Sequence, residues 1–392
     1  MKKIYLDYAA TTYVKNEVFD EMKPYFSEIY GNASSLHGFG REAMAGVDKA
    51  REQVAKVLKC ATSEIYFTSG GSESDNWAIR GIAKKKKAGH IITSKIEHPA
   101  VLNTLAELEK DGFDVTYLDV DHFGTVDVEQ LKKAIRPDTI LITIMSANNE
   151  VGTIQPIEEI GKIAKLHKIP FHTDAVQAMG VIDFDVKALN IDMLSLSGHK
   201  FYAPKGIGVL YVRNGLGLGK FLTGGEQERG MRAGTTMTPQ IVGLGKAIEM
   251  AYTNLPEHNA KLAKMRDYLI KRILTEIPYT TLNGHPTNRL PNNVNISYEY
   301  IEGESILMLL DLDGIAVSTG SACSSGSLKS SHVLLAMGVD IELAHGSIRM
   351  TLGDGTTMED LDYVVEKLTK AVDRLRFMSP LFCENKGEYK NV

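Results

Sequence analysis

The stretch "TILITIMSA", Thr139 to Ala147, is apolar along almost its whole length. A strand with one face in water alternates apolar and polar residues, whereas this run offers apolar side chains to both faces. Such a strand is typical of a parallel sheet that helices cover on both sides. The run therefore predicts a central strand of an α/β sheet.

On both sides of this run, short apolar strands alternate with amphipathic helices. Strands are predicted at 64–70, 90–94, 114–120, 169–175, 191–200 and 206–213, and helices at 73–87, 99–110 and 157–167. Repeated strand–helix–strand units predict a parallel-rich sheet between two helical layers.

From about Met237 the pattern changes. Two long helices are predicted at 238–253 and 257–276, and later ones at 304–311 and 358–376. The runs "NNVNISY", "GIAVST" and "GSIRMTL" are typical of strands in a second, smaller sheet. We expect an N-terminal segment (1–14) that packs with the small domain, a large domain (15–255) and a small C-terminal domain (256–392).

The composition excludes several classes of function. A net charge of −5 gives no electrostatic basis for binding nucleic acid or an anionic membrane surface. No apolar run approaches the roughly 18 residues of a membrane span, and the N-terminus lacks the apolar core of a signal peptide. The three cysteines are widely spaced without a CxxC pair, so we expect no metal site, no disulfide framework and a cytoplasmic protein.

The first strand of the large domain ends in Ser69-Gly70-Gly71-Ser72, where a helix begins. Glycines and a serine at a helix N-terminus offer backbone N–H groups and a hydroxyl to a phosphate. Alone this signal is weak, since Ser72 could simply cap the helix. The stretch matches neither the dinucleotide nor the nucleoside-triphosphate glycine pattern.

Polar residues also follow four consecutive strands, and sites in α/β sheets lie at such strand ends. Each residue alone is more commonly structural, but together they meet the needs of pyridoxal phosphate. Lys200 can form the Schiff base, and Asp174 can hold the ring nitrogen protonated. The remaining roles go to Asn149 and Gln177 at the phenolic oxygen, His98 on the ring, and Gly71, Ser72, Ser197 and His199 around the phosphate.

At this point the chain resembles the NifS/IscS cysteine desulfurases. The resemblance rests on "YLDYAATT", "FTSGGSESDN", "EHPA", "NNEVG", "HTDAVQ", "SLSGHKFYAPKGIG", "ERGMRAGT" and "STGSACSSGS", which occur in family order. It implies the aspartate-aminotransferase-like fold, known as fold type I: a large domain with a mostly parallel seven-stranded sheet, and a smaller α+β domain. It also implies a homodimer that uses pyridoxal phosphate to convert L-cysteine to L-alanine, leaving a persulfide on an enzyme cysteine.

The resemblance assigns roles to matching positions. Lys200 matches the Schiff-base lysine, Cys323 the sulfur acceptor, and His98 a histidine that stacks on the ring and relays protons. Arg349 matches the arginine that binds the substrate carboxylate, which suits a bidentate guanidinium. Cofactor contacts are implied for Gly71, Ser72, Asn149, Asp174, Gln177, Ser197 and His199, and for Thr235 in the other subunit's site; Asn149 also faces the substrate.

Cys323 lies among small residues, "GSACSSGS", rather than in an apolar core segment. The nucleophile must reach the substrate sulfur and then carry a persulfide to an acceptor, and small residues permit that movement. We therefore expect the mobile-loop subtype, which passes sulfur to an iron–sulfur scaffold or another acceptor.

Rival functions are a selenocysteine lyase or aminotransferase of the same fold, and a degenerate scaffold subunit. The cysteine argues against an aminotransferase, and the intact Lys200, Asp174 and Cys323 argue against a degenerate subunit. The sequence leaves open the acceptor, the pathway, activity on selenocysteine and the role of the tail after Pro380.

Overall fold

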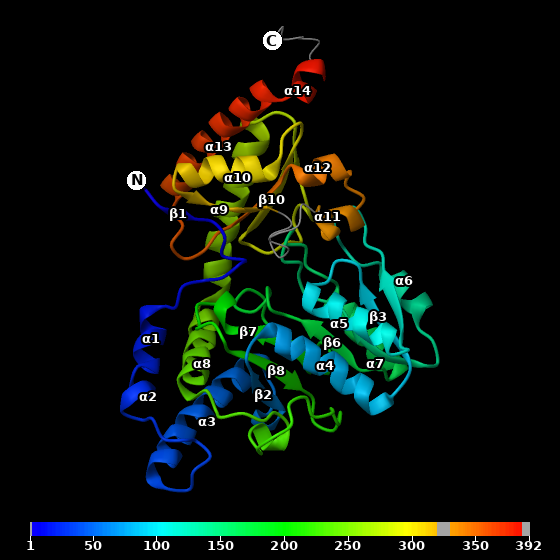
Figure 1. Ribbon diagram of the computed structural model, residues 1–392, viewed down its shortest axis with the longest axis vertical. Helices are drawn as coiled ribbons and strands as arrows, with labels where there is room; N and C mark the ends of the chain where they lie inside the picture. Colours follow the sequence, from blue (N-terminus) through cyan, green and yellow to red (C-terminus); the bar gives the residue numbers. More distant parts are fainter. Residues whose placement is uncertain (1, 320–329, 386–392) are drawn as a thin grey trace.

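A computed structural model of the protein describes residues 2–319 and 330–385. The opening apolar run forms β5 (Thr139–Thr143), one strand of a seven-stranded sheet (Figure 1). The others are β2 (Ile65–Thr68), β3 (His90–Ser94), β4 (Asp114–Leu118), β6 (Phe171–Asp174), β7 (Met193–Ser197) and β8 (Gly208–Val212). After β5 the run stays extended, and the N–H groups of Ile144 and Ser146 donate to carbonyls of His172 and Asp174.

The strand order is β2-β8-β7-β6-β5-β3-β4. Strand β8 runs antiparallel to both β2 and β7, and the pairs from β7 to β4 are parallel. No α-helix lies between β7 and β8, so the chain is too short there for a parallel crossover and β8 returns antiparallel to β7. The predicted mostly parallel seven-stranded sheet is confirmed.

Helices cover both faces of this sheet, as the apolar strands require. Side chains of β8 alternate between two cores, with Val209 and Tyr211 on one face and Leu210 and Val212 on the other. The first core is closed by α3 (Gly38–Leu58), α6 (Val128–Ala134), α7 (Ile157–His167) and α8 (Thr238–Thr253), and the second by α4 (Gly71–Lys86) and α5 (Pro99–Lys110).

A separate antiparallel sheet forms in the C-terminal part, with strand order β12-β13-β10-β9. Its strands are β9 (Thr280–Leu282), β10 (Asn293–Tyr298), β12 (Ser318–Thr319) and β13 (Ser347–Thr351). Its core includes side chains of α9 (Leu255–Glu276), α10 (Gly303–Leu312) and α13 (Met358–Met378). This second, smaller sheet was also predicted.

The N-terminal strand β1 (Ile4–Tyr5) pairs with β11 (Ile315–Ala316) beside the small sheet. The chain then enters the large domain through α1 (Asn16–Met22) and α2 (Pro24–Ser27). We propose the division at residue 255, because α8 packs in the large core and α9 in the small one. The remaining helices are α11 (His332–Ala336), α12 (Ile341–His345) and α14 (Pro380–Asn385).

Within residues 2–319 and 330–385, no helix has the length and apolar character that crossing a membrane requires.

Candidate active site

A cavity of about 340 Å³ lies at the carboxyl ends of the central strands, between the two sheets. That volume is in the range of small-molecule sites. The cavity brings together most of the predicted site residues: Gly71, Ser72, His98, Asn149, Asp174, Gln177, Ser197, His199, Lys200 and Arg349. Thr235 lies outside it in an exposed position, and Cys323 falls outside the described residues.

One end of the cavity is the N-terminus of α4. The first N–H groups of a helix have no acceptor within the helix, and Gly70 provides no side-chain cap. A Cβ on Gly71 would lie 2.7 Å from Val176 Cγ2, so only glycine lets the helix start this close to the β6 end. The Ser72 and Ser197 side chains line the same end. This arrangement suits a phosphate group.

His199 also lines the cavity, and its Nδ1 lies 3.1 Å from Thr11 Oγ1. Burial, together with the nearby Lys200 and Lys205, lowers the pKa of His199 to about 4. The ring is therefore neutral at physiological pH and acts as a hydrogen-bonding group.

Asp174 ends strand β6, and its Oδ1 accepts a hydrogen bond from Val176 N at 2.8 Å. Burial raises the pKa of Asp174, while His98 and Lys200 favour its ionised form. The carboxyl group thus lies in a buried site next to His98 and the Lys200 amine.

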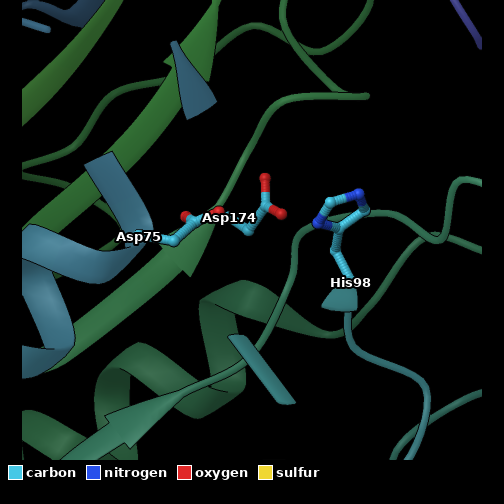
Figure 2. Close-up of side chains that lie close together, drawn as sticks. All are labelled: Asp75, His98 and Asp174. Atoms are coloured by element: carbon cyan, nitrogen blue, oxygen red, sulfur yellow. The ribbon is translucent and has the colours of Figure 1, made fainter. Parts of the chain in front are cut away.

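A second carboxyl group, Asp75, lies beside it, and sequence reasoning missed it. Figure 2 shows the side chains of Asp75, Asp174 and His98, whose polar atoms lie within 4.8 Å of one another. Burial and the neighbouring Asp174 raise the pKa of Asp75 well above its usual value. Its Oδ1 has no hydrogen-bond partner among the described residues and lies 3.7 Å from Nε2 of the buried His172. Asp75 follows Ser72 by one helical turn, and that spacing was the signal that places both on one face.

Asp75, His98 and Asp174 are also the residues here that could ligate a metal ion. The charge of Lys200 acts on both His98 and Asp174, however, and it opposes a cation at this position. A protonated ring nitrogen carries a single positive charge and donates a hydrogen bond to the buried carboxylate, so it suits the same groups with less repulsion than a divalent metal ion.

Lys200 follows β7 in a short 3-10 turn (Gly198–Lys200). Its Nζ donates to the carbonyl of Ala9 at 2.5 Å and to that of Ala10 at 2.8 Å. Gln177 Nε2 donates to the same Ala9 carbonyl at 2.9 Å. The N-terminal segment therefore forms one wall of the cavity, a role that sequence reasoning had not given it.

His98 caps helix α5, and its Nδ1 accepts from Ala100 N at 3.1 Å. In the neutral ring the proton must then be on Nε2. Burial lowers the pKa of His98, an effect that Asp174 opposes and that Lys200 and His332 reinforce. His98 is therefore a neutral imidazole that can pass protons.

The bend before His98 is fixed by Glu97, which is completely buried. Its carboxylate accepts from Ser94 Oγ at 2.5 Å and from Met145 N at 3.0 Å. Burial raises the pKa of Glu97 to about 8, although these hydrogen bonds favour the charged form.

Arg349 reaches the cavity from β13 of the small sheet and is only 2% exposed. Its Nη2 donates to Asp7 Oδ1 at 2.9 Å and its Nη1 to the Asn149 carbonyl at 3.1 Å. Its Nε has no partner among the residues that the structure describes. A buried guanidinium with a donor to spare suits a small carboxylate ligand.

Known proteins resemble this chain over nearly its whole length. The family described as "Aminotransferase class-V" matches residues 4–364. "Cysteine desulfurase IscS" of Clostridium botulinum (strain Hall) is 56% identical over 394 residues, covering 99% of both chains. The protein of the same name from Methanosarcina thermophila is 57% identical over 382 residues, covering 97% of this chain and 94% of its own.

Two solved structures are similar over most of the chain. A "NifS-like protein" superposes with a TM-score of 0.90 at 40% identity, covering 95% of this chain and 100% of that one. "SspA in complex with cysteine" gives a TM-score of 0.81 at 43% identity, covering 89% and 99% respectively.

Proposed function

Because the chain belongs to the class-V aminotransferase family and is 56% identical to a relative named cysteine desulfurase, we propose that it is a cysteine desulfurase that depends on pyridoxal phosphate. It converts L-cysteine to L-alanine and takes the sulfur as a persulfide on Cys323. The observation that carries the proposal is the cavity in which Lys200, Asp174, His98 and Arg349 surround one space.

The cavity fits the cofactor at both ends. The uncapped start of α4 suits the phosphate, and the buried Asp174 carboxyl, which lines the cavity beside Asp75, suits a protonated ring nitrogen. Gly71, Ser72, Ser197 and His199 would hold the phosphate, Asp174 the ring nitrogen, Asn149 and Gln177 the phenolic oxygen, His98 the ring face, and Lys200 the aldehyde carbon. When bound, pyridoxal phosphate supplies an electron sink for charge that develops at the substrate Cα.

The protein's own groups then bind the substrate and move protons. Arg349 binds the carboxylate of L-cysteine through its guanidinium. The Lys200 amine removes the α-proton as a general base. His98, neutral and carrying its proton on Nε2, passes protons between the reacting atoms.

Sulfur transfer is a balanced exchange of bonds. The thiolate of Cys323 attacks the substrate sulfur, so that an S–S bond forms as the substrate Cβ–S bond breaks. The electron pair of the broken bond stays on carbon, which takes up a proton to become the methyl group of alanine. The proton that the Cys323 thiol lost balances the one that carbon takes up, and the proton of the substrate thiol remains on the outer sulfur of the persulfide.

The first expected result tests the function itself. Purified protein with pyridoxal phosphate should be coloured and should release equal amounts of alanine and sulfide from L-cysteine when a thiol reductant is present. Borohydride should fix the chromophore on the peptide that contains Lys200. Label on any other lysine, or no alanine, would contradict the proposal.

We further propose that the active unit is a homodimer with shared sites. Five large apolar side chains near the N-terminus are each more than half exposed: Phe19, Phe26, Tyr30, Leu36 and Phe39. Such a group is typical of a surface that a partner covers. Thr235 is exposed and lies outside its own chain's cavity, which is consistent with a contact to the second subunit's phosphate.

Mixed dimers provide the second test. In a dimer of one Lys200→Ala chain and one Thr235→Ala chain, one site carries both lesions and the other carries none. We therefore expect activity in the mixed dimer, assayed at limiting cofactor, where each homodimer alone is impaired. Two different affinity tags select the mixed species. Activity no greater than the average of the two parents would show that each site uses a single chain. Arg232 is left intact, because it pairs with Glu73 in the first turn of α4.

The persulfide requires an acceptor, and we propose a sulfur-accepting protein such as an iron–sulfur scaffold. A thiol that must be free for attack is maintained in a reducing compartment, so we place the protein in the cytoplasm.

A further inference from the structure

Helix α11 lies on the side of the small domain that faces the large one (Figure 1). The residue that caps this helix, Ser331, donates through its Oγ to Glu150 Oε2 in the large domain. Both residues are at least 95% buried, and they are 181 positions apart in the sequence. A buried hydroxyl–carboxylate hydrogen bond of this kind is strong, because water does not compete for it.

The next residue makes a second contact across the same boundary. His332 Nε2 lies 3.0 Å from the carbonyl oxygen of Glu97. Because a carbonyl only accepts, this nitrogen must carry a proton. Glu97 is the buried residue that fixes the bend before His98.

Apolar packing supports these two hydrogen bonds. Val333 and Leu334 of α11 are completely buried and belong to one cluster with Ile96, Met145 and Val151 of the large domain. The cluster surrounds the backbone next to His98 and Asn149 with side chains from both domains.

Side chains of the small domain also bind the backbone of the turn that carries Asn149. The Asn149 carbonyl accepts from Arg349, and the Glu150 carbonyl accepts from Asn293 Nδ2 at 3.2 Å and Asn295 Nδ2 at 3.0 Å. Every one of these donors comes from the small sheet. The relative position of Asn149 and Arg349 is therefore set by contacts that cross the domain boundary.

The neighbouring serine has a different partner. Ser330 Oγ lies 2.8 Å from His345 Nε2, and both residues belong to the small domain. Two adjacent serines thus differ in their partners: Ser331 bonds across the boundary and caps α11, whereas Ser330 bonds within its own domain.

We propose that Ser331, His332 and Glu150 form an interdomain clasp whose members are positioning residues for the desulfurase reaction. The clasp holds the backbone at His98 and Asn149 at a fixed distance from Arg349, without itself touching cofactor or substrate. The expected fall in kcat rests on the proposed function. The expected change in backbone opening rests on the hydrogen bonds alone.

Loss of the clasp is expected to slow the reaction by misaligning His98. Proton transfer by His98 depends on the exact alignment of donor and acceptor, and a shift of about 1 Å costs up to ~10²-fold in rate. Burial raises the pKa of Glu150, which the Ser331 hydroxyl opposes. Losing that donor favours protonated Glu150, which no longer attracts this end of α11.

The test compares Ser331→Ala with Ser330→Ala in the cofactor-loaded protein. We expect Ser331→Ala to lower kcat for alanine formation by about ten- to a hundredfold. The Kd for L-cysteine, followed by cofactor absorbance, should rise by a much smaller factor, because Arg349 keeps its own hydrogen bonds to Asp7 and Asn149. Ser330→Ala should remain close to wild type. Ser331→Thr keeps the hydroxyl and the helix cap and should restore the rate. Glu150→Ala should act like Ser331→Ala, and the double variant should be no slower than either single one.

Amide hydrogen exchange gives a reading that is independent of activity. Peptides that cover residues 95–101 and 145–152 should exchange faster in Ser331→Ala and not in Ser330→Ala, because their local opening becomes easier. Equal rates and equal exchange in the two alanine variants would overturn the clasp. A proportional loss of kcat, cysteine binding and thermal stability would overturn the positioning role. If wild type forms no alanine, the proposed function fails, and the exchange data still decide whether the clasp exists.

Discussion

Replacement of Cys323 by serine is expected to abolish the release of alanine and sulfide from L-cysteine. A hydroxyl is a far weaker nucleophile than a thiolate toward sulfur, so no S–S bond forms and the substrate keeps its Cβ–S bond. The rate should fall by roughly 10³-fold or more, as when other enzymes lose their nucleophile. Arg349 and Lys200 are untouched, so L-cysteine should still bind and change the cofactor absorbance.

The two other cysteines provide matched controls. Burial raises the pKa of Cys60 to about 12, so its thiol stays protonated and unreactive at neutral pH. Cys60→Ser should therefore retain desulfurase activity. Cys383 lies outside the "GSAC" motif, so Cys383→Ser should retain activity as well. Sulfide release that persists in Cys323→Ser, or is lost in Cys60→Ser, would contradict the assignment of the nucleophile.

Asp174→Asn is expected to have the second largest effect. The substitution keeps the size of the side chain and an oxygen that accepts from Val176 N, but it removes the negative charge in a buried site. Without that charge a ring nitrogen in the site loses its proton more readily, and removal of the substrate α-proton becomes harder. We expect a loss of roughly 10²- to 10³-fold in kcat, the range for one preorganised electrostatic group. Cysteine binding should persist.

The neighbouring carboxyl offers the control. Asp75 is as deeply buried as Asp174, and burial together with the neighbouring Asp174 raises the pKa of Asp75 well above its usual value. Asp75→Asn keeps the shape of the side chain and should cost less than about tenfold in kcat, which corresponds to the ~1 kcal/mol of a typical hydrogen bond. If Asp75→Asn is the more damaging of the two, then Asp75 rather than Asp174 carries the charge at the ring nitrogen.

The sequence by itself determined the architecture and most of the cavity wall. Apolar runs such as Thr139–Ala147 lack the alternation of a half-exposed strand and have the length of a strand rather than a helix, so the doubly covered parallel sheet could be predicted from local pattern. The ends of parallel strands meet at one edge, and for that reason His98, Asn149, Asp174 and Lys200 could be predicted to converge.

Asp75 was within reach of the same reasoning and was missed. It lies one helical turn beyond Ser72, so helix geometry alone directs it toward the same space. The spacing does not predict that Asp75 is buried beside Asp174, because this burial depends on how α4 packs against β6 and β7.

Only the tertiary structure decided the contacts between distant segments. The Ala9 and Ala10 carbonyls that accept from Lys200, the Asp7 carboxylate on Arg349, and the clasp between Ser331 and Glu150 join positions 181 to 342 residues apart. No periodicity relates such positions, since each pairing forms only when the N-terminal segment and the small domain pack against the strand ends. Local pattern fixes what each segment becomes, and the long-range packing fixes which polar groups meet, because a buried donor must find whichever acceptor the fold brings to it.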